Sequence, residues 1–192
     1  MTKIKKIIQE SIAVKTSLLN DEVLIQTVET VSQVVVNAFK ADHKVWFCGN
    51  GGSAADAQHL AAELSGRFYY DRDPLFAEAL HVNTSYITAV GNDYGYDEIY
   101  ARLVRAKGRK GDILFCISTS GNSPNILKAI EVAKKRDIIV VGMTGKTGGK
   151  MGAMCDFLLN VPSNDTPRIQ ESHILLGHII CQLVEERMFP QK

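Results

Sequence analysis

Apolar residues recur at intervals of three and four through the first forty positions of the chain, which is the period of an amphipathic helix. A first set opens the chain, and a second set follows after a short polar break. The two sets are Ile4, Ile7, Ile8 and Ile12, and then Val23, Leu24, Val28, Val31, Val34 and Val35. They predict a helical lead-in over residues 1–42 whose two helices run antiparallel.

Beyond Lys44 the pattern changes to short apolar runs that end in small or polar residues, as buried strands do. The runs cover residues 45–48, 113–117, 138–143 and 157–161, and a weaker one covers 77–82. Helical segments alternate with them near 53–64, 85–90, 96–106, 123–135 and 166–188. The alternation predicts a three-layer α/β sandwich, a five-stranded parallel sheet with helices on both faces. We expect one domain over residues 1–192, with its core in 43–192 and a long last helix.

Composition and charge exclude several classes of protein. The 22 basic residues nearly balance the 21 acidic ones, for a net charge of +1, and no basic stripe indicates a nucleic-acid partner. No uncharged apolar run approaches the ~18 residues of a membrane span, and no apolar core of a secretory signal follows the basic start. The cysteines, Cys48, Cys116, Cys155 and Cys181, have neither zinc-site nor disulfide spacing. These features predict a cytoplasmic protein with reduced thiols.

A glycine-rich turn, residues 48–53, follows the first predicted strand and opens a helix. Backbone N–H groups and the positive helix end can meet an anion there without a Cβ in the way. Gly49, Gly51 and Ala54 also satisfy a loose dinucleotide pattern. That pattern needs an acidic residue at the end of the next strand, about 20 positions on, whereas Asp71 and Asp73 lie in a loop before it. The turn therefore favours an anion site over a dinucleotide site.

A second strand end carries four hydroxyls, from Ser118, Thr119, Ser120 and Ser123. They could surround a phosphate together with backbone N–H groups. The alternative is an ordinary turn in which Ser123 or Asn122 caps the next helix. Two such junctions in one small α/β chain favour a ligand site, because ligands bind where neighbouring strand ends open a crevice.

His59 and Glu63 stand four apart on the helix that follows the glycine-rich turn, so they share one face and could hold a metal or a substrate. A structural pair is the commoner outcome of such spacing. On the last helix several polar residues fall near one face, and spacing alone does not choose among them. These are Gln170, Glu171, His173 and His178.

Several long strings occur in register over nearly the whole chain: CGNGGSAADAQHLAAELSGR, GNDYG, ISTSGNS, MTGKTGGKM and RIQESHILLGH. In this order and spacing they resemble the bacterial phosphoheptose isomerases, which carry a sugar isomerase (SIS) domain. The resemblance implies a flavodoxin-like fold, a sugar-phosphate substrate and a homo-oligomer, a tetramer. Thr166-Pro167 departs from those relatives that place an acidic residue there to reach the sugar, although Pro suits the first turn of a helix.

The resemblance also implies roles for individual residues. The implied substrate-binding residues are Asn50, Gly51, Gly52, Glu63, Arg67, Asn92, Asp93, Ser118, Thr119, Ser120, Ser123 and Gln170. One zinc ion per subunit is implied on His59, Glu63, Gln170 and His178. An amide oxygen is a poor zinc ligand beside imidazole and carboxylate, so weak or exchangeable metal binding would suit this set.

The implied reaction is a ketose–aldose isomerisation of D-sedoheptulose 7-phosphate to D-glycero-D-manno-heptose 7-phosphate, for bacterial surface heptose. It moves a proton from C1 to C2 through an enediol, and so needs an acid/base pair. Glu63 and His178 match that pair. The alternative is a catalytically inactive relative that binds the replication initiator DnaA as a scaffold. Fold does not separate the two, but the presence of both residues favours the enzyme.

Overall fold

The computed structural model describes residues 2–191, which fold around a five-stranded parallel sheet with the order β2-β1-β3-β4-β5. The strands are β1 (Val45–Gly49), β2 (Ala77–Ala79), β3 (Ile113–Ile117), β4 (Ile139–Thr144) and β5 (Phe157–Asn160). Parallel strands buried on both faces need apolar residues at consecutive positions, and β1 and β3 are buried throughout. The predicted sandwich is confirmed, with the strand order of flavodoxin-like folds.

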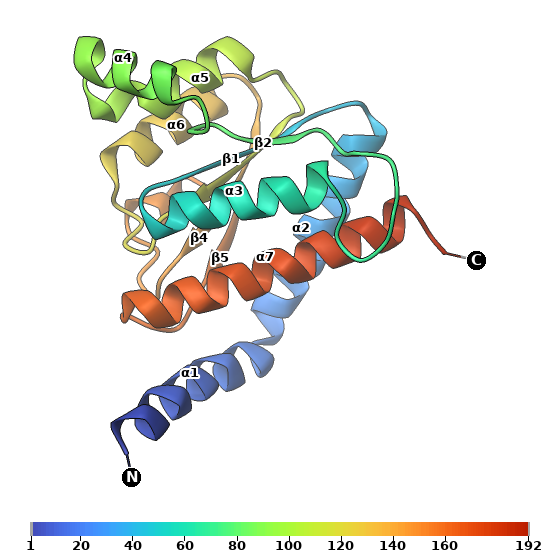
Figure 1. The fold of residues 1–192 in the computed structure, drawn as a ribbon, viewed down its shortest axis with the longest axis vertical. Coiled ribbons are helices and arrows are strands. Elements are labelled where there is room, and N and C mark those ends of the chain that lie inside the picture. The colour runs from blue at the N-terminus through green and yellow to red at the C-terminus, as the bar shows by residue number, and fades with distance from the viewer. Residues whose placement is uncertain (1, 192) are drawn as a thin grey trace.

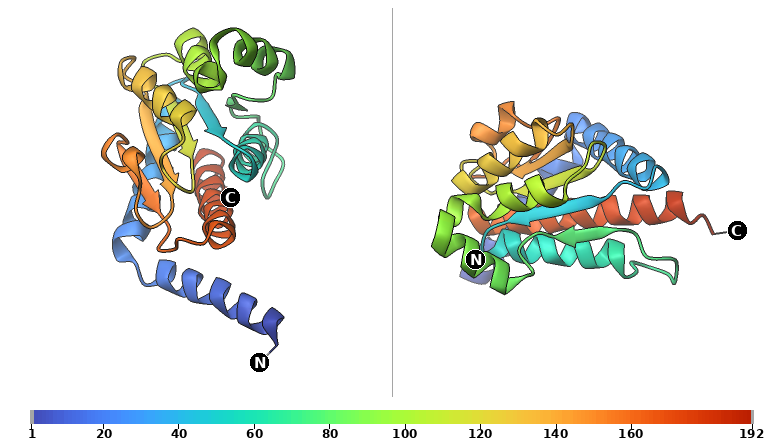
Figure 2. Two further views of the ribbon diagram at one scale, coloured as in Figure 1. Left: turned by 90° about the vertical axis from the view of Figure 1, so that its left-hand side faces the viewer. Right: turned by 90° about the horizontal axis from the view of Figure 1, so that it is seen from above.

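Helices cover both faces of the sheet (Figures 1 and 2). One face packs α2 (Glu22–Lys40), α3 (Gly52–Ser65) and α7 (Thr166–Met188) in a single apolar core around Phe47 and Phe115. The other face packs α4 (Thr84–Tyr94), α5 (Ile99–Lys107) and α6 (Pro124–Lys134) around Trp46 and Leu114. Alternate residues of β1 and β3 thus serve opposite layers.

Two predicted elements differ from the observed ones. The run 77–82 forms a strand of only three residues, because the chain turns after Ala79 and soon begins α4. Asn83 caps that helix: its Oδ1 accepts a hydrogen bond from Tyr86 N. The predicted helix 96–106 begins instead with a 3₁₀ turn, Tyr96–Glu98, before α5. Of the helices within residues 2–191, none is both long and apolar enough to cross a membrane.

The antiparallel arrangement predicted for the lead-in is wrong. α1 (Lys3–Leu19) extends away from the body instead of lying back along α2 (Figure 1). Polar contacts join it to α7: Ser11 Oγ donates to Glu171 Oε2 at 2.7 Å, and Arg168 Nη1 donates to Ile7 O at 3.0 Å. The apolar stripe of α1 is therefore left exposed, and Ile4 and Ile12 are 71% and 56% accessible.

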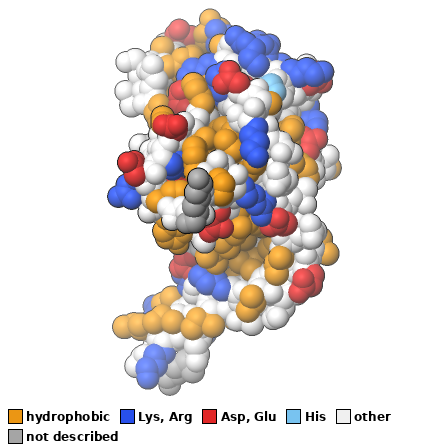
Figure 3. Space-filling view, turned by 90° about the vertical axis from the view of Figure 1, so that its right-hand side faces the viewer, with side chains coloured by type: hydrophobic (Ala, Val, Ile, Leu, Met, Phe, Trp, Pro, Cys, Tyr) orange, Lys and Arg blue, Asp and Glu red, His pale blue; other side chains and the backbone are white. Residues whose placement is uncertain are grey.

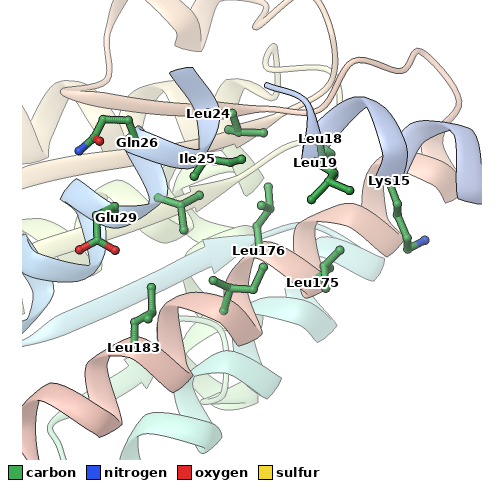
Figure 4. Close-up of a pocket in the computed structure, with 12 residues that line it drawn as sticks. Lys15, Leu18, Leu19, Leu24, Ile25, Gln26, Glu29, Leu175, Leu176 and Leu183 are labelled. Carbon is green, nitrogen blue, oxygen red and sulfur yellow. The ribbon is translucent and has the colours of Figure 1, made fainter. Parts of the chain in front are cut away.

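An open apolar groove of about 510 Å³ lies where α1, α2 and α7 meet. Figure 3 shows hydrophobic side chains gathered around this hollow, and Figure 4 shows them pointing into it. The groove is lined by Lys15, Leu18, Leu19, Leu24, Ile25, Gln26, Val28, Glu29, Leu175, Leu176, Ile179 and Leu183.

The helices α3 and α7 run parallel and lie unusually close at two points. A Cβ on Gly177 would lie 2.5 Å from both methyl groups of Leu60, and a Cβ on Gly52 would lie 2.4 Å from Nε2 of Gln170. A side chain at either glycine would push the helices apart. The contact joins the start of α3 to the first turns of α7 and continues to the middle of both helices.

Candidate active site

The close contact of α3 and α7 brings three polar side chains together on the molecular surface. His59 Nε2 lies 2.9 Å from Glu63 Oε1, and His178 Nε2 lies 3.4 Å from His59 Nε2. One ligand atom from each of the three residues falls within 4.8 Å of the others. His59 and Glu63 share a face of α3, as their spacing predicts, and only the packing of α7 adds His178.

The geometry of this cluster suits a divalent metal. Tetrahedral zinc with bonds of about 2.0–2.2 Å separates its ligand atoms by about 3.3 Å, close to the separations of 2.9 Å and 3.4 Å that His59 Nε2 makes with Glu63 Oε1 and His178 Nε2. Two imidazole nitrogens that face each other at 3.4 Å also need a shared partner or a single proton between them. Two imidazoles and a carboxylate form a zinc donor set, so the residues fit the ion.

Gln170, the fourth implied ligand, lies elsewhere in this structure. Its amide packs against Gly52 at the first turn of α3, and His178 follows eight residues later on α7. The other candidate residues on α7 make contacts elsewhere and do not join the cluster. Glu171 pairs with Arg168 and Lys15, and His173 is fully buried. The structure thus selects His178 from this helix, and a metal-binding role of Gln170 stays a prediction.

Burial lowers the pKa of His178, the neighbouring His59 lowers it further, and Glu63 opposes both effects. A lowered pKa keeps the imidazole neutral near neutral pH. In that form a ring nitrogen can bind a metal or accept a proton. Phe68 lies beside it, with the two ring centroids 5.6 Å apart.

Reciprocal amide hydrogen bonds join the glycine-rich turn to the first turn of α6. Asn50 Nδ2 donates to Asn125 Oδ1 at 2.9 Å, and Asn125 Nδ2 donates back to Asn50 Oδ1 at 2.8 Å. Tyr96 Oη adds a bond to Asn50 Oδ1 at 3.2 Å. Asn125 is buried and was not among the predicted site residues. Its one sequence signal was its place directly after the hydroxyl-rich turn.

The hydroxyl-rich turn is not closed by an ordinary helix cap. Ser123 occupies the N-cap position of α6, but its side chain makes no capping hydrogen bond. Its Oγ instead lies 3.1 Å from Ser118 Oγ. The cap by Ser123 or Asn122 that the ordinary-turn alternative requires is therefore not formed, and Asn125 Oδ1 accepts from Ile126 N at 3.0 Å in the first turn of α6 instead.

A polar cavity of about 260 Å³ opens beside this turn, at the carboxyl ends of the central strands. Thr119 and Ser120 line it, as the prediction of a phosphate site requires. Five further polar side chains were missed: Lys146, Thr147, Ser163, Asn164 and Thr166. They follow β4 and β5, so the strand-end argument applied to the first two turns could have found them. At the Thr166-Pro167 pair, where the sequence departs from some relatives, Thr166 lines the cavity and begins α7, and Pro167 stands in the first turn of this helix.

The SIS domain family model matches residues 8–145, which is more than half of the chain. A phosphoheptose isomerase of Aneurinibacillus thermoaerophilus is 53% identical over 189 residues, covering 98% of this chain and 96% of its own. The chain belongs to the phosphoheptose isomerase family. It is accordingly a sugar-phosphate isomerase with a SIS domain.

Two solved structures of this family match the whole fold. The phosphoheptose isomerase of Neisseria gonorrhoeae has a TM-score of 0.90 and 44% identity, over 96% of this chain and 97% of its own. The phosphoheptose isomerase of Francisella tularensis has a TM-score of 0.91 and 38% identity, over 97% of this chain and 100% of its own. The recognised resemblance is thereby confirmed.

Three family positions make no hydrogen bond to the cluster among the residues that the structure describes. Arg67 is exposed in the loop after α3. Asn92 and Asp93 are exposed at the end of α4, where Asn92 Nδ2 donates to Asp93 Oδ1 at 2.9 Å. Their contacts with substrate stay predictions.

The thiols are free, and Cys48, Cys116 and Cys181 are buried, as the sequence predicts. Although distant in sequence, Cys48 and Cys116 meet across neighbouring strands with sulfurs 3.6 Å apart. The S–S bond of a disulfide is about 2.05 Å long, so these are two thiols in contact.

His173 gives a test of the structure that does not depend on activity. Its Nε2 donates to Thr144 O at 3.1 Å, and burial lowers its pKa to about 4. The unfolded chain takes up this proton near pH 6.5, so the stability contribution is present above that pH and is lost as the pH falls towards 4. Between about pH 7 and about pH 5 the loss should be about 2 kcal/mol.

The measurement is urea unfolding of wild type and His173→Gln at both pH values and one protein concentration. Glutamine cannot titrate, so the difference in stability between the two proteins should shrink at the lower pH. Equal losses in both proteins would contradict a buried, neutral His173.

Proposed function

We propose that the enzyme converts D-sedoheptulose 7-phosphate to D-glycero-D-manno-heptose 7-phosphate, as a cytoplasmic step in making bacterial surface heptose. The observation that carries the proposal is the convergence of His59, Glu63 and His178 at one point. A ketose–aldose isomerase needs a base at carbon, a proton carrier at oxygen and stabilisation of the developing charge. This cluster can supply all three.

The layout of the site supports a long sugar phosphate with its reacting carbons far from the phosphate. Ile169 lines the cavity beside Thr119 and Ser120. His178 lies nine residues further along α7, an axial distance of about 13 Å at 1.5 Å per residue. With its phosphate at the hydroxyl-rich turn, an extended heptose 7-phosphate would direct C1 and C2 towards the cluster. Gly52 and the Gln170 amide that packs against it lie near the cavity end of the two helices and would face the sugar there.

In the proposed mechanism Glu63 removes a proton from C1, which leaves an enediolate with its charge on the C2 oxygen. His178 carries a proton to that oxygen, which gives the enediol, and takes one from the C1 hydroxyl. Protonated Glu63 then returns its proton to C2 to give the aldose. Zinc, if held by His59, Glu63 and His178 with Gln170 as the fourth ligand that the resemblance implies, would supply a Lewis acid that polarises the carbonyl. Oε1 of Glu63 faces His59 at 2.9 Å, so Oε2 is the atom we assign to proton transfer.

Glu63→Gln should lower turnover of sedoheptulose 7-phosphate by ~100-fold or more, in line with loss of a general base. The amide is nearly isosteric, and the hydroxyl-rich turn is unchanged, so substrate affinity should stay within about tenfold. His178→Asn should also impair turnover. Glu131→Gln, an exposed change on α6, is the matched control. Product analysis gives the rate, and calorimetric titration gives the affinity.

One result would decide for the DnaA-binding scaffold. If the wild type, supplied with zinc, bound the sugar phosphate and never converted it, the catalytic assignments to Glu63 and His178 would fail together.

Zinc should copurify or restore activity after chelation. His59→Ala and Gln170→Ala should lower metal occupancy, measured by elemental analysis, more than they lower affinity for inorganic phosphate. Ser123→Ala should do the reverse, because the phosphate turn and the cluster stand on different elements. Full activity in verified metal-free protein would remove zinc from the proposal and leave the isomerase reaction standing.

We also propose that the chain assembles as a homotetramer around the groove formed by α1, α2 and α7. The isoleucines of α1 and the apolar walls of the groove are left uncovered by the rest of the described chain, and an exposed apolar surface of this kind marks an interaction site. A second copy of the chain is a suitable occupant, since symmetric self-association is the commonest way to cover such a face. The number four rests on the family.

Light scattering at micromolar concentration should give four times the 21.1 kDa of one chain. Leu19→Glu, at a groove residue 72% exposed in the single chain, should lower the molar mass without unfolding the protein. Val82→Glu, at an exposed residue outside the groove, is the control. A wild-type mass equal to one chain would contradict the assembly.

A further inference from the structure

A charged carboxylate is buried in α7, two turns beyond His178. Glu185 has no accessible surface. Its Oε1 accepts from Phe68 N at 2.9 Å and Arg72 Nε at 3.1 Å, and its Oε2 accepts from Tyr69 N at 2.7 Å. Burial alone would raise the pKa of Glu185, but these N–H groups and the guanidinium outweigh it, and the pKa is lowered. The group is ionised and fully partnered, as a buried charge has to be.

The partner of this carboxylate, Arg72, closes the end of α3. Nη2 donates to Glu63 O at 2.8 Å, and Nη1 donates to Leu64 O and Gly66 O, each at 2.8 Å. Carbonyls in the last turn of a helix lack partners within the helix, and a planar guanidinium can serve several of them at once. The arginine therefore binds the backbone of Glu63 itself.

The two residues link both helices of the cluster through hydrogen bonds. Glu185 and His178 are seven residues apart and share a face of α7. Phe68, whose N–H the carboxylate accepts, places its ring 5.6 Å from that of His178. The link runs from the Glu63 carbonyl through Arg72 to Glu185, and so to the helix that carries His178.

We propose that Arg72 and Glu185 are positioning residues, which fix Glu63 against His178 so that the cluster is formed before metal or substrate arrives. The proposal rests on the proposed function of that cluster. A donor displaced by even about 1 Å weakens metal binding and slows chemistry, and such supporting contacts are typically worth 10- to 100-fold.

The rival explanation is that this ion pair stabilises the fold and nothing more. Asp112 provides a control for it, because it is an equally buried carboxylate at the opposite, amino-terminal edge of the strands. It accepts from Lys44 N at 3.0 Å, Arg109 N at 2.9 Å and Trp46 Nε1 at 3.0 Å. Asp112→Asn should cost stability like Glu185→Gln but leave α3 and α7 in place.

The test compares Arg72→Lys, Glu185→Gln and Asp112→Asn with wild type, each below its own unfolding temperature. Zinc affinity, from competition with a chromophoric chelator, should fall about 10- to 100-fold in the first two and stay within about twofold in the third. For sedoheptulose 7-phosphate, kcat should fall in Arg72→Lys and Glu185→Gln. KM should stay within about threefold of wild type, because neither change touches the hydroxyl-rich turn. Lysine keeps the charge beside Glu185 but not the fork that reaches Glu63 O, so it should not rescue zinc affinity.

Wild-type zinc affinity in folded Arg72→Lys and Glu185→Gln would overturn the proposal, as would equal losses in all three variants. Should the arginine variant not fold, the isosteric Glu185→Gln decides alone. If the wild type itself binds no zinc, the metal site of the proposed function is wrong, and the kinetics decide the positioning role. A lower kcat at unchanged KM would then support it, and an unchanged kcat would refute it.

Discussion

The close parallel packing of α3 against α7 is the contact on which the site depends. It requires no side chain at Gly177, where Leu60 fills the space, and none at Gly52, where Gln170 lies. Two helices packed this closely cannot slide along each other without leaving a void or creating a steric clash. His59 and Glu63 on one helix and His178 on the other inherit their separations from this packing.

The candidate site consists of two regions, one at the strand ends and one on α3 and α7. The sheet fixes the position of one relative to the other. At the strand ends, backbone and hydroxyl groups suit an anion, and the reciprocal amides of Asn50 and Asn125 join the glycine-rich turn to the start of α6. Further along α3 and α7, imidazoles and a carboxylate suit metal binding and proton transfer. In the proposed function, affinity for the phosphate and chemistry at the carbonyl therefore depend on different residues.

Local patterns predicted most elements because each is specified by its own residues. The apolar runs gave β1 and β3 within a residue, and the long last helix has the predicted bounds. The arrangement of the two lead-in helices was predicted wrongly. The apolar period of α1 was correct, but a period shows only which face of a helix is apolar, not what covers that face. The rest of the chain leaves the isoleucines of α1 uncovered.

By itself the sequence determined the sandwich and, through the resemblance of its motifs, the family, and it predicted an anion site at two of its turns. It placed His59 beside Glu63, because four residues make one turn of a helix. Only the tertiary structure decided that His178 and not His173 completes the cluster, that Asn125 braces the glycine-rich turn, and that Arg72 closes α3 on Glu185. These contacts join residues from 9 to 119 positions apart, and the longer ones depend on how packed layers meet, which no local period encodes.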